Sequence, residues 1–438
     1  MSAARAEALP AAAARRVRPW LLVAPATAML AWGGNHFTPL LLMYRQVDGY
    51  SSVEVDLFLA FYILGLVPGF LIGGPLADRG GRKRVMVAGI AMSALGSAVL
   101  AAGAASPIWL CAGRLVVGVS VAVAMVAGTA WIEELSQPPY DPGAGAAGAR
   151  RASLALTAGF GIGAGVSGAL AQWAPAPTVL PYAVQIALLL AAAAPLAWAP
   201  ETRNRFAAAP GDAAAVEAAG PVPAESLGAT LRALAADLRV PRHARARFFR
   251  VVLPSAPWAF GALAIAYVVA PALVGSKVGT DRVAFATLLT VVALGTGALV
   301  QPLVARIALA TGGRQLILGL GLTLIGVALC AVEAAVVSPA LAVVIAIVMG
   351  LGYGISIVSG LTEVQRMAGP DDLAGLTGIY CSLTYVGFLL PVALASLAGA
   401  ASYVTLLIVV AALCLACLVT AGWNLRAGPA AEADAALA

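Results

Sequence analysis

The feature that most limits the fold of this chain is a series of long apolar segments separated by short polar ones. Hydrophobic residues make up 61% of its 438 residues and charged residues only 11%. A soluble domain is nearer about 45–50% apolar and about 25% charged. A water-soluble fold of this size has no interior large enough to hide so much apolar surface, so lipid must surround most of the chain.

A helix needs about 20 mostly apolar residues to cross a bilayer. The sequence contains twelve such segments: 19–43, 54–74, 85–103, 107–132, 152–173, 178–198, 251–274, 283–304, 315–336, 339–362, 373–397 and 400–423. We therefore predict an all-α integral membrane protein with a tail at 1–18, a six-helix bundle at 19–198, a central loop at 199–250, a second six-helix bundle at 251–423 and a tail at 424–438.

Lysine and arginine favour the cytoplasmic side of a membrane. With the N-terminus in the cytoplasm, Arg45, Lys277 and Arg282 lie in outer loops and Arg114 lies within a span, which leaves 22 of 26 basic residues inside (26 − 4). This distribution predicts a multi-pass protein of the cell membrane with both termini and the central loop in the cytoplasm. It also accounts for the net charge of +6 without nucleic acid as a partner.

The two halves of the chain repeat each other at an offset of 232 residues (257 − 25 = 232). At this offset, four residues of the first half match identical residues of the second: Pro25, Pro39, Gly118 and Gly128 match Pro257, Pro271, Gly350 and Gly360. The repeat predicts two pseudo-symmetric bundles, an organisation typical of transporters built from parallel halves.

The segment 73–89, GGPLADRGGRKRVMVAG, concentrates five charged side chains within seven residues. Cytoplasmic anchoring explains the basic residues but not Asp78. The segment resembles the signature loop between helices 2 and 3 of the major facilitator superfamily, and we expect Pro75 to end helix 2 there. The resemblance implies a conformational lock, whose contacts hold one state of a rocking transporter. The lock residues are Gly74, Asp78, Arg79, Gly81, Arg82 and Lys83.

Other positions extend the resemblance. Arg114 followed by Gly118 is similar to the motif of helix 4 in that superfamily. Four residues resemble the cytoplasmic charge network of its sugar-porter branch: Glu134, Arg150, Arg151 and Glu201. The second copy of the signature loop has Ala305 where the first has Asp78, so the lock is expected in the first half alone. The branch stays open between drug-exporter-like and sugar-porter-like.

Polar residues inside the spans are candidates for a substrate cavity. An intramembrane charge such as that of Arg114 costs roughly 2.5–3.5 kcal/mol by insertion scales, so it must face the interior of the bundle. The candidates for the cavity are Trp32, Asn35, His36, Arg114, Tyr267, Tyr353 and Tyr385. Asn35 and Tyr267 correspond at the repeat offset. Helix packing and hydrogen bonding between helices are the alternative roles for these residues.

Other classes of site are excluded by spacing. The segment GAGVSG at 163–168 fits G-x-G-x-x-G, but its surroundings are helical and apolar, so a dinucleotide site is not expected. No Walker loop, metal-ligand cluster or nucleophile–base pair occurs in the sequence. We therefore expect no cofactor, no metal and no enzymatic activity.

The expected function is secondary active transport of a small organic solute by alternating access, with protons as coupling ion and efflux as direction. The alternatives are proton-coupled or facilitated import of a sugar-like or other polar metabolite, and a non-transporting sensor on the same scaffold. The expected partners are a small molecule, the lipid bilayer and protons, and the expected oligomeric state is a monomer.

Overall fold

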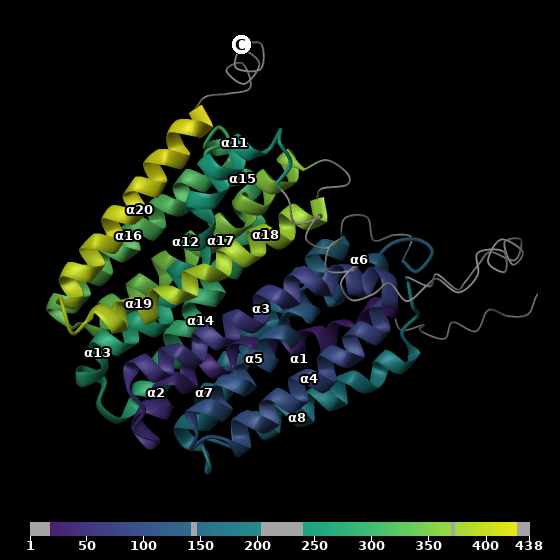
Figure 1. The fold of residues 1–438 in the computed structure, drawn as a ribbon, viewed down its shortest axis with the longest axis horizontal. Helices are drawn as coiled ribbons and strands as arrows, with labels where there is room; N and C mark the ends of the chain where they lie inside the picture. Colours follow the sequence, from purple (N-terminus) through teal and green to yellow (C-terminus); the bar gives the residue numbers. More distant parts are fainter. Residues whose placement is uncertain (1–17, 142–146, 203–239, 369–372, 427–438) are drawn as a thin grey trace, which may run out of the picture.

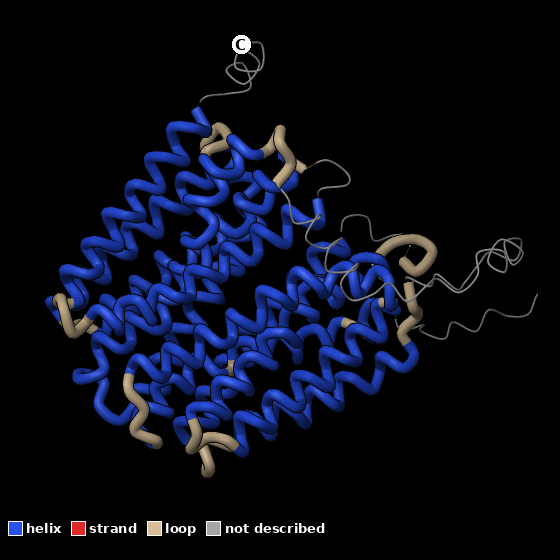
Figure 2. The backbone as a smooth tube through the Cα atoms, in the orientation of Figure 1, coloured by secondary structure: helices blue, strands red, loops and turns tan. Residues whose placement is uncertain are grey.

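A computed structural model describes residues 18–141, 147–202, 240–368 and 373–426. The backbone alone is described at Pro75, Asp78, Arg79, Leu373, Ala374 and Arg426. The described segments form helices joined by short loops and contain no strand (Figure 2). The expected tails at 1–17 and 427–438, and most of the expected central loop, lie outside the described residues.

The first half contains six helical spans, some divided by short turns of other helix types. Their bounds are η1 (Pro19–Leu22) with α1 (Ala24–Asn35) and α2 (Phe37–Val47), α3 (Ser52–Gly80), α4 (Arg82–Ala102), α5 (Pro107–Val123) with η2 (Ala124–Gly128) and α6 (Thr129–Glu134), α7 (Ala147–Trp173), and α8 (Leu180–Ala193) with η3 (Ala194–Trp198).

The second half repeats this order. Its bounds are α11 (Arg245–Arg247) with η4 (Phe248–Val252), α12 (Leu253–Ala264), η5 (Ile265–Val269) and α13 (Ala270–Val278), then η6 (Gly279–Asp281) and α14 (Arg282–Val300) with η7 (Gln301–Leu303) and α15 (Val304–Ala310), α16 (Gln315–Val336), α17 (Pro339–Met367), α18 (Leu373–Val386) with η8 (Gly387–Leu389) and α19 (Leu390–Leu397), and α20 (Tyr403–Arg426).

Ten continuous helical stretches of the described chain are long and apolar enough to cross a bilayer. One of them, Arg245–Ala310, has 66 residues and would be roughly 100 Å long if straight. It reverses at η6 so that α13 packs against α14, and therefore supplies two crossings. The pair α1 and α2, divided at His36, supplies another crossing. Counted in this way, the helices give the arrangement of twelve spans.

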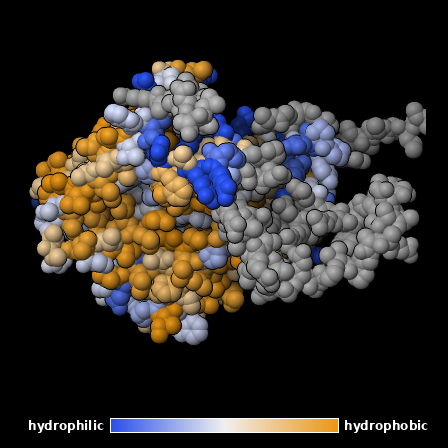
Figure 3. All heavy atoms as spheres, turned by 45° about the horizontal axis from the view of Figure 1, so that its top comes forward, coloured by the Kyte–Doolittle hydropathy of each residue, from blue (hydrophilic) through white to orange (hydrophobic). Residues whose placement is uncertain are grey.

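Large apolar side chains lie on the outside of the helices, as lipid requires. Among the most exposed are Leu309 at 86%, Ile108 at 78% and Leu299 at 76%. Figure 3 shows apolar residues over a broad area of the visible face, with hydrophilic residues gathered toward its upper side. Hydrocarbon tails would cover such a surface, whereas water would not tolerate it.

The 232-residue repeat is visible in how helices pack. A Cβ atom on Gly118 of α5 would overlap the carbonyl oxygen of Tyr62 in α3, and one on Gly350 of α17 would overlap that of Ala293 in α14. Only glycine permits such close approach of two helices. Matching glycines therefore make matching contacts in the two bundles.

The first and seventh spans depart from a continuous α-helix at equivalent places. A turn at His36 divides α1 from α2, and the position 232 residues later, Val268, lies within the π-helical turn η5. Such turns free backbone groups inside a bundle and often occur at functional sites.

The two bundles share one apolar core at one end and have separate cores at the other. A shared cluster includes Phe58 and Tyr62 from the first half with Phe260 and Phe388 from the second. At the end that carries the α3–α4 turn, Arg245 and the α15–α16 turn, which we call the basic end, each half has its own cluster among the described residues. In Figure 1 the ribbons of α2, α7 and α14 lie close together at lower left, and the bundles diverge toward the upper right.

The orientation predicted from basic residues can be tested by labelling. Lys277→Cys, at the end opposite the basic end, should react with a membrane-impermeant maleimide in intact cells. Arg314→Cys, exposed at the basic end, should react only after permeabilisation. The background replaces Cys381 and Cys417, the two partly exposed native cysteines, with serine. Reversed labelling would place both termini outside the cell.

Candidate functional site

The signature segment forms a one-residue turn between two long helices. We expected the second span to end at Pro75, and this is wrong: that span, α3, continues to Gly80, and α4 begins at Arg82. A proline removes one backbone hydrogen bond but leaves the neighbouring ones in place, so the chain reverses only at Gly81. Gly81 has φ +92°, a backbone conformation that residues other than glycine rarely adopt.

Glu201, which follows η3, binds this turn. Its Oε1 accepts a hydrogen bond of 2.9 Å from the backbone N–H of Arg82, and its Oε2 accepts one of 2.9 Å from that of Lys83. The first N–H groups of a helix lack internal partners and carry partial positive charge, so a carboxylate stabilises them. The Nζ of Lys83 in turn donates to the carbonyl of Ala197 at 3.1 Å.

Arg82 joins a third helix to the same cluster. Its side chain, 5% exposed, lies 3.1 Å from the carboxylate of Glu134 at the end of α6. The hydroxyl of Thr202 also donates to Glu134. The start of α4, the end of α6 and the residues after η3 are thus held together at the basic end. We call Arg82, Glu134, Glu201 and Thr202 the charge cluster.

The remaining residues predicted for the lock and the charge network lie apart or outside description. Gly74 lies within α3, and the side chains of Asp78 and Arg79 are outside the described residues. Arg151 forms a separate ion pair with Asp141 at 2.8 Å and stacks over Trp20 at 4.6 Å.

Arg150 is exposed and forms no ion pair within the described segments. Sequence reasoning missed Asp141, which carries no motif. Thr202, by contrast, ends the PET segment that accompanies Glu201.

A pocket lies between the two halves, near the middle of the spans. Asn35, Tyr267, Tyr353 and Tyr385 all line it. The other lining residues come from both halves and are mostly apolar or aromatic: Gly34, Thr38, Leu59, Tyr62, Phe160, Phe260, Leu263, Leu294 and Phe388. We call this the central pocket. Its phenylalanines carry no signal in the sequence, because an apolar residue in a span can equally face lipid.

Aromatic rings form most of its second-half wall. The ring centroid of Phe260 lies 4.2 Å from that of Tyr385 in a stacked pair and 5.4 Å from that of Tyr353. The hydroxyl of Tyr385 donates to the sulfur of Met125 at 3.2 Å, a contact between the two halves. On the first-half side, Asn35 donates to the carbonyl of Phe160 at 3.4 Å. The wall of the pocket is therefore mostly aromatic and is built from both bundles.

Three predicted cavity residues lie outside the lining. Trp32 donates to the hydroxyl of Ser167 at 3.3 Å. His36 is fully buried and meets the ring of Tyr182 edge-on at 5.0 Å. Arg114 is also fully buried. Since Asn35 and His36 are adjacent on a helix, they point about 100° apart, and only Asn35 faces the pocket.

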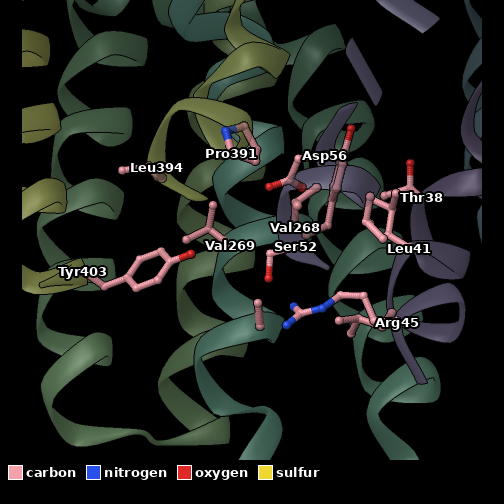
Figure 4. A pocket seen from close by; sticks show the side chains of 14 residues that line it. Thr38, Leu41, Arg45, Ser52, Asp56, Val268, Val269, Pro391, Leu394 and Tyr403 are labelled. Atoms are coloured by element: carbon pink, nitrogen blue, oxygen red, sulfur yellow. The ribbon is translucent and has the colours of Figure 1, made fainter. Parts of the chain in front are cut away.

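A second pocket lies closer to the end opposite the basic end. Figure 4 shows Arg45 of α2, Asp56 of α3 and Tyr403 of α20 around it. Thr38 and Tyr267 line both this outer pocket and the central pocket, so they lie between the two. Polar groups from both halves therefore meet between the central pocket and the end opposite the basic end.

Gln172 connects the halves at the same end. Its Nε2 donates to the carbonyl of Thr280 at 3.2 Å, and its Oε1 accepts from the backbone N–H of Ala284 at 3.0 Å. Ala284 lies in the first turn of α14, where backbone N–H groups need outside acceptors. The side chain of one bundle thus caps a helix of the other.

Two helical bundles around a central pocket are the architecture of a membrane transporter. The sequence profile of the Major Facilitator Superfamily matches residues 23–268, more than half of the chain. The chain belongs to the major facilitator superfamily, a family of transporters of small molecules rather than of enzymes.

Solved transporters share the fold. The POT family transporter PepTSo aligns with a TM-score of 0.69 at 12% identity, over 93% of this chain and 97% of that one. The nucleoside transporter NupG aligns with a TM-score of 0.62 at 14% identity, over 92% of this chain and 98% of that one. At these identities the likeness concerns the fold alone.

A sequence relative covers a smaller region. The mouse solute carrier family 2, facilitated glucose transporter member 10, is 33% identical over 90 residues, which are 20% of this chain. The match spans 17% of that protein's length.

The turn at Gly81 predicts a sharp difference between neighbouring glycines. Gly81→Ala should destabilise the protein by about 1–2 kcal/mol for the positive φ alone, and its Cβ would also lie 2.8 Å from Oε2 of Glu201. Gly80→Ala is the matched control, because its Cβ meets nothing within 4 Å. Thermal unfolding in detergent measures both. Equal unfolding temperatures for the two variants would contradict the role of this turn.

Proposed function

We propose that this protein is a secondary active transporter that moves a small organic solute across the cell membrane by alternating access. The observation that carries the proposal is the position of the central pocket, which lies between two bundles. Among the described residues, these bundles share an apolar core around the pocket and have separate cores at the basic end. A solute held in the pocket reaches one side of the membrane when the bundles meet at the other. Exchange between the two arrangements moves the solute across.

The described state is proposed to face the cytoplasm. The bundles share their apolar core around the central pocket and are linked by Gln172 beyond it, while their basic ends have separate cores. With the basic end in the cytoplasm, this arrangement closes the outer path. The charge cluster then stabilises the first bundle in this state, and the lock residues Asp78 and Arg79 are proposed to act beside it.

The lining of the central pocket favours an apolar or aromatic solute. Stacked rings such as Phe260 and Tyr385 bind flat surfaces through dispersion and ring geometry. The few polar groups, among them the amide of Asn35 and the tyrosine hydroxyls, can orient a solute by hydrogen bonds. These features favour efflux of such a solute as the first hypothesis.

Import of a sugar-like metabolite is the second hypothesis. Its support is the 90-residue match to a facilitated glucose transporter, together with the contacts of Glu134 and Glu201 in the charge cluster.

Coupling to protons needs a group that takes up a proton on one side of the membrane. Asp56 is a buried carboxylate of α3, 7% exposed, in the outer pocket with Arg45 and Tyr403 (Figure 4). We propose Asp56 as the candidate proton carrier. We also propose that the transporter acts as a monomer.

Flux in proteoliposomes tests the function. We expect saturable transport of at least one solute from a panel of aromatic, sugar-like and amphipathic compounds, and accumulation driven by an imposed pH gradient. Phe260→Ala should raise the KM several-fold, since ring pairs contribute about 0.5–1.5 kcal/mol beyond their buried area.

Phe249→Ala is the matched control, because this phenylalanine is 56% exposed on the outside of the bundle. Flux that is indifferent to the gradient would remove proton coupling. A panel with no flux at all would favour the sensor.

Gln172 provides a test of the outer closure. Gln172→Leu should raise the rate at which a cysteine in the central pocket, Leu294→Cys, is labelled from outside. The substitution removes both hydrogen bonds of Gln172. The net loss of even one bond, about 1 kcal/mol, would raise the population of the outward-open state roughly fivefold. Gln365→Leu, exposed at the basic end, is the matched control. An unchanged labelling rate in Gln172→Leu would show that this side chain does not hold the outer end closed.

A further inference from the structure

Arg114 of α5 is a cation enclosed by aromatic rings. Its side chain is fully buried, and its guanidinium carbon lies 4.1 Å from the ring centroid of Tyr62 and 4.5 Å from that of Phe37. Ring faces attract a cation but accept hydrogen bonds poorly. This arrangement therefore compensates part of the charge and leaves the N–H donors of the guanidinium without strong acceptors.

The donors of Arg114 are in fact unmatched. Its Nε and Nη1 atoms are buried and have no hydrogen-bond acceptor. Within the described segments, the ion pairs are Arg82–Glu134, Arg151–Asp141, Arg247–Glu363 and Arg366–Glu363, so no carboxylate pairs with Arg114. A buried cation without a partner costs several kcal/mol. Buried polar groups nearly always have partners, so one that lacks them needs a specific explanation.

Among the described residues, no carboxylate pairs with Arg114. His36 is close enough to interact with it electrostatically, and both ring nitrogens of His36 are also buried without a hydrogen-bond partner. The hydroxyls of Tyr44 and Tyr182 lie nearby and bond to each other at 2.8 Å. Two adjacent side chains with unused polar atoms thus mark a place suited to an acceptor group.

Tyr62 connects this place to the central pocket. One face of its ring lies against the guanidinium of Arg114, and the same residue lines the pocket together with Asn35 and Phe160. Tyr62 therefore lies between Arg114 and the pocket, and a molecule in the pocket can reach the guanidinium only if the side chain of Tyr62 moves. Rotamer changes of this kind are common at binding sites.

We propose that Arg114 binds the anionic group of the transported solute, and that the solute is an organic anion with a carboxylate on an aromatic or apolar body. The proposal deepens the proposed transport function and rests on it. The carboxylate accepts charge-assisted hydrogen bonds from the guanidinium, while the body stacks on the rings around Phe260. One buried cation then selects anions within a pocket that is otherwise apolar.

Matched pairs of carboxylates and amides test the selection. The probes are benzoate, 3-phenylpropionate and indole-3-acetate, each with its amide, and equilibrium dialysis against the purified protein measures binding. We expect a carboxylate to bind at least tenfold more tightly than its amide. Arg114→Gln should abolish this preference and Arg114→Lys should retain part of it. If no carboxylate binds more tightly than its amide, or if Arg114→Gln keeps the preference, the proposal is overturned.

Two further measurements exclude simpler roles. Arg114→Gln should raise the unfolding temperature because it removes a buried unpaired charge, whereas Arg151→Gln, which breaks an ion pair, should lower it. If Arg114→Gln instead lowers the unfolding temperature and leaves carboxylate binding unchanged, Arg114 is a structural anchor and the proposal is overturned. Chloride titration is the second measurement. Chloride binding that depends on Arg114, without any carboxylate preference, would make the site one for inorganic anions and overturn the proposal.

Flux separates this inference from the proposed function. If neutral aromatic solutes cross the membrane and carboxylates do not, transport stands and the assignment of an anionic solute fails. If carboxylates bind through Arg114 and no solute of any charge crosses, binding stands and the transport function fails.

Discussion

Lipid offers no hydrogen-bond partners, and this constraint governs the whole structure. Every backbone N–H and C=O within the membrane must be satisfied by the protein, so the spans are helices. The departures from regular helix, at His36 and in η5, occur where neighbouring helices enclose the backbone. Tyr267 of η5 lines the central pocket, and His36 lies next to Asn35, which lines it too. The same constraint that makes the chain helical therefore also restricts where a binding site can form.

Duplication supplies the framework, and differences between the copies supply the chemistry. Gly118 and Gly350 set equivalent helix contacts in the two bundles. The position of Arg114 corresponds to Ala346 in the second half, so the buried cation has no counterpart there (346 − 114 = 232). At the basic end, by contrast, both bundles have ion pairs: Arg82–Glu134 in the first and Arg247–Glu363 in the second. The asymmetry of the pseudo-symmetric scaffold therefore lies in its buried, unpaired cation.

Charge pairing separates the arginines that hold the structure from the one assigned to the solute. Arg82 and Arg151 each meet a carboxylate at the basic end, which offsets the cost of removing their charge from water. Arg114 lies against the ring faces of Phe37 and Tyr62, and its Nε and Nη1 have no acceptor among the described residues. Groups that lower stability without a local benefit are commonly found where function needs them.

The sequence by itself determined the membrane class, the spans, the 232-residue repeat and the family resemblance, because hydropathy and motifs are local properties of the chain. It also singled out Asn35, Tyr267, Tyr353 and Tyr385, since polar atoms within apolar spans need a protected place. Only the tertiary structure decided which faces of these helices meet. It placed Phe260 in the pocket, kept His36 out of it, moved the turn from Pro75 to Gly81, and left Arg114 without a carboxylate. Each of these depends on helix rotation and on contacts between distant segments, which apolar periodicity in lipid does not specify.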